Sequence, residues 1–235
     1  MNKAAVAKPT AKGETLRKAI LDAASKLFIE RGLGGTSMQD IADALGLTRT
    51  AVYYYFKNKE TILESLTEDV TLFARRLTAE VAARADLEPG KALRGLVEHH
   101  ARLILSRPFE FRVADRNESD LPPKLRAAAE TARRGVLENF TNVIERGVRA
   151  GEFRMLDSRI TAFALIGMCN WTAWWFKAGG RKSEAEIAEI LGDLALHAVK
   201  REAGRTPREA DVQESIRLLR EDLAYLEKQL VTRAG

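Results

Sequence analysis

Apolar residues recur at three- and four-residue steps along most of the chain, which is the spacing of amphipathic helices. The first run begins at Glu14 and ends at Arg31-Gly32, and two short runs follow, to Leu45 and over 49–55. No stretch alternates polar and apolar residues well enough to predict a strand. The pattern therefore predicts an all-α protein. Further helices are expected at about 60–84, 90–106, 109–118, 122–150, 157–177, 183–203 and 207–232.

Capping residues indicate where the short helices begin. Thr36 and Gln39 have the spacing of a capping box, so Thr36 is expected to open the second helix. Thr48 is an expected N-cap for the third helix, and Asn58 for the fourth. These three starts delimit two short helices on either side of Gly46.

The helices around Gly46 have the spacing of a helix-turn-helix. This motif needs a small residue where the helices cross, a glycine with positive φ in the turn, and an apolar residue that closes a small core. Ala42, Gly46 and Val52 meet these needs at steps of four and six residues. Spacing alone also occurs in helical proteins of other kinds, so the surrounding charge and motifs matter.

Basic charge is concentrated near the start of the chain. The whole sequence has 38 Lys and Arg against 33 Asp and Glu, a net charge of +5. Residues 1–60 contribute 10 − 6 = +4 of this surplus, and the remainder contributes 28 − 27 = +1. A local surplus suggests a polyanionic partner, either nucleic acid or a membrane surface, although a solvated lysine-rich tail is the plain alternative.

The motifs of residues 23–63 resemble the DNA-binding segment of the TetR family of bacterial transcriptional regulators. The resemblance rests on AASKLFIERG at 23–32, TSMQDIA at 36–42, GLT at 46–48 and VYYYFKNKETIL at 52–63. It implies a three-helix DNA-binding domain followed by a helical ligand-binding and dimerisation domain. The domains are then expected as a disordered basic arm (1–13), a helix-turn-helix domain (14–62), a ligand-binding and dimerisation domain (63–204) and a coiled-coil-like helix (205–235).

The same resemblance implies which residues meet DNA. Arg49, Thr50 and Tyr53 match recognition-helix positions that face the major groove, where an arginine can bind a guanine through O6 and N7. A second group matches positions that meet phosphates or the groove edge: Ser37, Gln39, Thr48, Tyr54 and Lys59. The implied function is a repressor that binds a palindromic operator as a homodimer and is released by a small effector.

An aromatic segment points to the effector. Residues 167–176 with Gly179-Gly180 are similar to the family branch that responds to acyl-CoA or steroid-CoA thioesters. Candidate ligand-binding residues are Arg102, Phe109, Arg112, Arg116, Phe140, Ile144, Trp171 and Trp174. Candidate interface residues are Leu165, Met168, Trp175, Ile187, Leu191 and Leu194. Packing of the tryptophans in a core or interface is the alternative, because aromatic stripes at helical spacing usually pack.

Residues 207–232 carry a heptad seam that the family does not require. Its apolar positions are four and three residues apart: Val212, Ile216, Leu219, Leu223, Leu226 and Leu230. This helix can pair with a second subunit or lie on its own domain. A helical scaffold that acts through this seam without specific DNA binding is the alternative function.

Other chemistry is not indicated. There is no phosphate-binding glycine loop, zinc signature or nucleophile elbow, so no enzyme, metal site or cofactor is expected. The single cysteine, Cys169, excludes an intramolecular disulfide and fits a reducing compartment. No apolar run is long enough to span a membrane. A cytoplasmic regulator is therefore expected.

Overall fold

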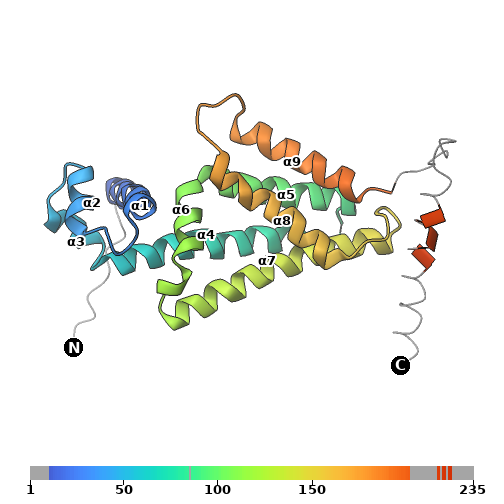
Figure 1. The fold of residues 1–235 in the computed structure, drawn as a ribbon, viewed down its shortest axis with the longest axis horizontal. Coiled ribbons are helices and arrows are strands. Elements are labelled where there is room, and N and C mark those ends of the chain that lie inside the picture. The colour runs from blue at the N-terminus through green and yellow to red at the C-terminus, as the bar shows by residue number, and fades with distance from the viewer. Residues whose placement is uncertain (1–10, 85, 202–215, 218, 221, 224–235) are drawn as a thin grey trace.

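A computed structural model describes residues 11–84, 86–201, 216–217, 219–220 and 222–223. The described chain is helical, as predicted, and has two parts (Figure 1). A small N-terminal part contains α1, α2, α3 and the start of α4 and is called the reading head, after the DNA binding that the resemblance implies. Helix α4 continues into a larger part, called the regulatory domain after the role that the resemblance implies. The elements are α1 Ala11–Arg31, α2 Met38–Ala44, α3 Arg49–Tyr55, α4 Lys59–Ala82, α5 Pro89–Ser106, α6 Pro108–Arg116, the 3-10 turn η1 Glu118–Asp120, α7 Pro123–Arg149, α8 Ser158–Trp175 and α9 Glu184–Val199.

The helix caps confirm two predicted starts and correct a third. Thr48 and Asn58 cap α3 and α4, each accepting a hydrogen bond from the backbone N–H three residues later. The prediction that Thr36 and Gln39 open α2 is wrong, because Ser37 is the N-cap and forms the capping box with Asp40. The Thr36 hydroxyl is instead buried and donates to the carbonyls at the end of α1.

The helix-turn-helix frame is as predicted from its spacing. Ala42 and Val52 are fully buried, and Gly46 has a φ of +63° in the turn between α2 and α3. A side chain at this φ would be strained, so the glycine fits its place. The frame belongs to an apolar core that also takes residues from α1 and the first half of α4.

The regulatory domain packs around α5. This helix contacts α9, α8, α4 and α7, and the long helix α7 also packs along α4. Its core includes Leu96, Phe140, Ile144 and Cys169, which are all fully buried. Phe153, between α7 and α8, is buried too and pairs its backbone with Lys200 after α9.

Helix α6 connects the two parts. Its Val113, with Leu121 just after η1, is buried in the core of the reading head rather than in that of the regulatory domain. The same helix contacts α8 and α4. Figure 1 shows α6 standing at the junction between the head and the helices of the larger domain. Its position therefore makes it a physical link between them.

Helices α8 and α9 together present an exposed face rich in apolar side chains, here called the α8–α9 face. It consists of Ile160, Phe163, Trp171, Trp175, Ile190 and Leu194. Among the predicted interface residues, Trp175 and Leu194 lie on this face and Met168 is half-buried. Leu165, Ile187 and Leu191 are corrections, because they turn inward and pack in the core of their own domain.

Part of the prediction concerns residues that the structure does not describe. Residues 1–10 of the basic arm lie outside the described residues, while residues 11–13 form the first turn of α1. In the heptad seam, Ile216, Leu219 and Leu223 are described, helical and exposed. Its other three positions, Val212, Leu226 and Leu230, lie outside the described residues.

Candidate DNA-reading surface and effector cavity

The recognition helix α3 presents polar and aromatic side chains to solvent. Arg49, Thr50 and Tyr53 are all exposed, and Tyr54 is 84% exposed. Val52 points the other way into the head's core, since it is fully buried. One face of α3 thus holds the head together, while the other is available for the edges of base pairs.

Arg49 and Tyr53 form a pair one helical turn apart. The Arg49 guanidinium donates a hydrogen bond of 2.9 Å to the Tyr53 hydroxyl and lies 5.2 Å from the centroid of its ring. Both side chains are exposed, so the pair restricts the arginine without burying it. This arrangement leaves further guanidinium N–H groups to donate to a base or a phosphate.

The other predicted DNA residues serve local structure as well. The Thr48 hydroxyl caps α3, and Ser37 caps α2, where its hydrogen bonds hold the pKa of Asp40 below the usual value. The Gln39 amide donates to Asp43 over 2.7 Å. All three side chains remain exposed, so their polar groups are accessible to a phosphate.

The position of Lys59 differs most from the predicted contact with a phosphate or the groove edge. Its half-buried ammonium donates to the carbonyl oxygens of Leu33 and Thr36 over 2.8 and 3.3 Å. It therefore ties the start of α4 to the turn between α1 and α2. Its neighbour Lys57 is exposed in the α3–α4 turn and is a phosphate candidate that sequence reasoning missed, although it lies in the same motif.

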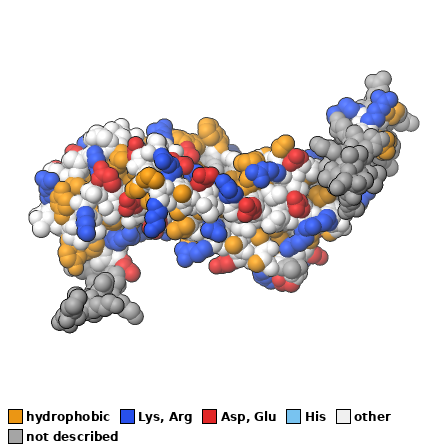
Figure 2. Space-filling model, turned by 90° about the horizontal axis from the view of Figure 1, so that it is seen from below, with side chains coloured by type: hydrophobic (Ala, Val, Ile, Leu, Met, Phe, Trp, Pro, Cys, Tyr) orange, Lys and Arg blue, Asp and Glu red, His pale blue; other side chains and the backbone are white. Residues whose placement is uncertain are grey.

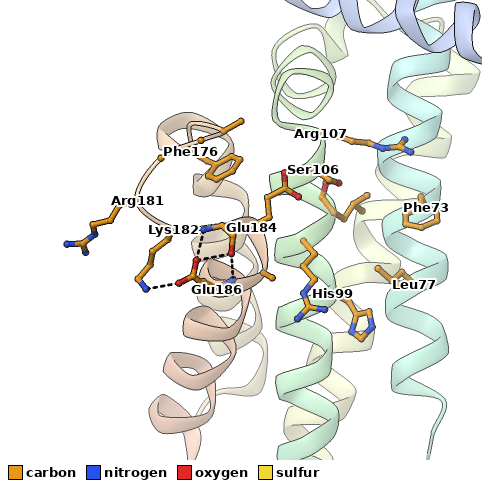
Figure 3. Close-up of a pocket in the computed structure, with 17 residues that line it drawn as sticks. Phe73, Leu77, His99, Ser106, Arg107, Phe176, Arg181, Lys182, Glu184 and Glu186 are labelled. Atoms are coloured by element: carbon orange, nitrogen blue, oxygen red, sulfur yellow. Dashed lines mark hydrogen bonds and ion pairs between the residues drawn. The ribbon is translucent and has the colours of Figure 1, made fainter.

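A cavity of about 1020 Å³ opens beside α5 in the regulatory domain. Figure 3 shows α4 on one side of α5 and the α8–α9 loop on the other. Apolar side chains on its wall include Phe73, Leu77, Leu103 and Phe176. Its cationic side chains are Arg102, Arg107, Arg181 and Lys182, and its acidic ones are Glu184 and Glu186. A ligand with both an apolar part and an anionic part suits such a wall.

Only one of the predicted ligand-binding residues, Arg102, lines this cavity. Phe140 and Ile144 are fully buried in the core and do not belong to the cavity wall, so their predicted ligand contact stays a prediction. Trp171 is 64% exposed on the α8–α9 face. The sequence could not place the cavity, since its walls come from segments as distant as 73 and 186.

The remaining predicted ligand residues form a stack between α6 and α8. The guanidinium of Arg112 lies 4.7 Å from the Phe109 ring centroid, and that of Arg116 lies 5.0 Å from the Trp174 ring centroid. Burial, with a smaller contribution from Arg116, lowers the pKa of Arg112. These residues hold α6 against α8 by cation–π contacts and do not line the cavity.

Two buried polar groups lie in the core beside α8. The Cys169 thiol points at the Val97 carbonyl, 3.8 Å away, and burial raises its pKa to about 12, which makes it unreactive. His100 Nε2 lies 3.0 Å from Asn170 Oδ1, and its Nδ1 has no hydrogen-bond partner in the described part of the protein. Burial lowers the pKa of His100.

The described residues contain no group of acidic, cysteine and histidine side chains that could hold a metal ion. No helix within the described ranges has the length and apolar character needed to cross a membrane. On the face seen in Figure 2, acidic and basic side chains are interspersed along the molecule. That face therefore has the mixed charge of an ordinary solvated surface.

Both parts of the chain match known protein families. Residues 20–66 match the family model of bacterial regulatory proteins of the tetR family, and residues 86–199 match a tetracycline repressor-like C-terminal domain. The chain is 26% identical over 199 residues to the HTH-type transcriptional repressor KstR2 of Mycolicibacterium smegmatis, covering 80% of this chain and 92% of that protein.

Two solved structures extend the comparison. The TetR family transcriptional regulator PfmR of Thermus thermophilus is 33% identical, with a TM-score of 0.67, over 77% of this chain and 99% of that one. AibR, solved in complex with isovaleryl coenzyme A and operator DNA, is 28% identical with a TM-score of 0.61. That match covers 76% of this chain and 96% of AibR.

Proposed function

The chain belongs to the TetR family of bacterial regulatory proteins, and we propose that it is a dimeric repressor released from its operator by a coenzyme A thioester. The observation that carries the DNA-binding part is the exposed face of α3, with the Arg49–Tyr53 pair on a rigid helix-turn-helix. The similar protein AibR has a structure with both DNA and a coenzyme A thioester, which supports the effector class.

The α8–α9 face supports the dimer. Six large apolar side chains on adjacent helices are exposed, and burying them against the same face of a second copy would give a twofold pair. A twofold pair places two α3 helices at successive turns of a palindromic operator, so each head adds to the affinity of the other.

The cavity supports an amphiphilic anion as effector. The phenyl rings of Phe73 and Phe176 suit an acyl chain, and Arg102, Arg107 and Lys182 suit the phosphates of coenzyme A. The relatives are transcriptional regulators, and we propose that this protein is likewise a regulator and not an enzyme. A cytoplasmic location follows from the DNA partner.

The test begins with selection of bound DNA from a random pool, followed by footprinting on the selected sequence. Protection of a palindrome is expected, and Arg49→Gln should relax the preference at one base pair per half-site by about 1–3 kcal/mol. Arg149→Gln, which removes an equal charge from the distant end of α7, is the matched control and should bind as the wild type does.

The effector is then tested with isovaleryl-, octanoyl- and palmitoyl-CoA. Tryptophan fluorescence reports binding, because Trp174 and Trp175 lie within two residues of Phe176 of the cavity wall. At least one thioester should both bind and release the selected DNA. Binding of DNA without release by any thioester would refute the effector class, and the absence of a protected sequence would refute the whole proposal.

A further inference from the structure

The chain continues beyond the domain that it shares with its family. The matched C-terminal domain ends at residue 199, which is the last residue of α9, and the heptad seam lies after it. Ile216, Leu219 and Leu223 of this seam are described and helical, and they are 43%, 67% and 60% exposed. Three large apolar side chains at helical spacing are thus left open to solvent in a single copy of the chain.

The segment after α9, here called the extension, leaves the regulatory domain from a fixed point. The backbone N–H of Arg154 donates to the carbonyl oxygen of Val199 over 2.9 Å, and that of Arg201 donates to Glu152 over 3.0 Å. Figure 1 shows this end of α9 at the opposite end of the molecule from the reading head. The extension therefore begins far from the recognition helix α3.

The proposed twofold dimer brings the starting points of both extensions to the same end. Both reading heads must face one DNA duplex, so the twofold axis runs from the DNA toward the opposite end of the dimer. Each copy of α9 ends there (Figure 1). The two extensions therefore leave in the same direction, and the residues at 202–215 span up to ~3.3–3.6 Å each, which is enough to bring two seams together. Identical segments that run in the same direction about a twofold axis can pair in parallel and in register.

The order of residues along the seam suits such a parallel pair. The steps of three and four residues place Ile216 and Leu223 at a positions of the heptad and Leu219 at a d position. In parallel coiled coils, a β-branched residue at a with leucine at d favours two strands. The sequence continues the apolar a and d positions on both sides of these three residues.

We propose that the extension pairs with the same segment of a second copy, as a parallel coiled coil at the end of the dimer opposite the DNA. This inference rests on the twofold dimer of the proposed function and adds a second contact to it. A seam of about three heptads is near the lower limit for an independent coiled coil. It therefore holds the two copies together only in combination with the α8–α9 face.

The second contact slows the separation of the two copies. Once the α8–α9 faces have met, the two extensions are tethered near each other, so their pairing is effectively intramolecular. Linking two contacts in this way can raise the overall affinity by about 10²–10⁴-fold. The dimer then persists at lower protein concentrations than the α8–α9 face alone would allow. Because the extension begins far from α3, it stabilises the dimer without adding contacts to DNA.

Cysteine cross-linking of the full chain tests which residues meet. In a parallel pair each seam residue faces its own counterpart, so Leu219→Cys should form an intermolecular disulfide when it is oxidised with diamide. The native Cys169 does not compete, because it is buried and its pKa is raised to about 12. Arg217→Cys is the matched control, since position 217 lies off the seam in the same helix. It should give little cross-linked product.

Native mass and subunit exchange test where the pairing occurs and what it does. Sedimentation should give the mass of two chains. Exchange of subunits between dimers labelled at the N-terminus with donor or acceptor dyes should be about tenfold faster for Leu219→Ser than for the wild type, because changes at an interface act mainly on dissociation. Arg217→Ser should exchange as the wild type does, and thermal melts establish that each variant is folded.

The pairing is overturned if Leu219→Cys gives no more cross-linked product than Arg217→Cys, which is the result for an antiparallel pair or for an extension that lies on its own domain. A native mass of four chains would place the pairing between dimers and contradict its position within one dimer. Equal exchange rates for Leu219→Ser and Arg217→Ser would exclude a contribution to dimer stability. A mass of two chains without the cross-link refutes this inference alone, whereas a mass of one chain refutes the proposed dimer as well.

Discussion

The half-buried Lys59 offers the sharpest test of how the reading head is held together. Lys59→Met keeps the length of the side chain but removes the ammonium that donates to the carbonyl oxygens of Leu33 and Thr36. The bond to Leu33 is short at 2.8 Å, and the bond to Thr36 at 3.3 Å is near the limit of useful geometry. If Lys59 acts as this tie, the variant loses stability as well as charge.

The expected loss can be worked from these two bonds. A hydrogen bond to a charged group is worth about 1.5–3 kcal/mol, and the second, longer bond adds little. Lys59→Met should therefore lower the free energy of unfolding by about 2 kcal/mol. For a chain of 150–250 residues that corresponds to a fall in Tm of roughly 4–8 °C.

The exposed Lys57, two residues earlier, is the matched control. Lys57→Met removes the same charge from the same motif, and a surface change of this kind alters stability by no more than about 0.5 kcal/mol. If Lys57 meets a phosphate, its loss should reduce the slope of log affinity against log salt by about 0.9 per contact. A Lys59→Met variant with unchanged Tm and a reduced salt slope would refute the tie and make Lys59 a phosphate contact.

Three further predictions concern the regulatory domain. Trp171→Glu puts a charge on the α8–α9 face and should shift the protein toward monomer in sedimentation runs; an unchanged mass would exclude this face as the interface. His100→Gln should remove part of the pH dependence of the unfolding free energy below pH 6.5. Because the pKa of His100 is lowered in the folded state, only the unfolded chain gains the proton there. Wild-type stability should therefore fall as the pH drops, by at most ~1.4 kcal/mol per pH unit. Urea titrations at several pH values measure this, and a wild type equally stable at pH 5 and 7 would contradict it. Val113→Ala and Val136→Ala should each lower the free energy of unfolding by about 2 kcal/mol. Only Val113→Ala, in the head's core, should also weaken operator binding, because it loosens the packing of α6 on the head, and equal operator affinities of the two variants would contradict this.

The reading head could be predicted because its determinants are local. Gly46, the caps Thr48 and Asn58, and the apolar steps around them lie within a few residues of one another, and each has one main structural use. The error at Thr36 shows the limit of such reasoning. Thr36 and Ser37 are both residue types that favour the N-cap position. Only the fold shows that the Thr36 hydroxyl donates to the carbonyl oxygens of Leu27 and Gly32 instead.

The regulatory domain was predicted less well because α8 is apolar on more than one side. Leu165 faces the core and Trp171 faces solvent, yet both fit a helical stripe. Similarly, Phe140 is a large apolar residue of the kind that lines ligand pockets, and in the structure it packs in the core. The cavity joins α4, α5 and the α8–α9 loop, and no local pattern reports which distant segments meet.

Helix α6 shows why the link between the domains could not be predicted from the sequence. The periodicity predicts a helix near 109–118, but it cannot show that Val113 belongs to the head's core while Arg112 and Arg116 reach α8. Within the described chain, α1 is the head helix with substantial contacts to α4 and α6. The start of α4 is part of the head's core, so α4 joins the two parts as one continuous helix. The contacts between the two parts that can loosen without bending a continuous helix are therefore those of α6 and Leu121 with the head.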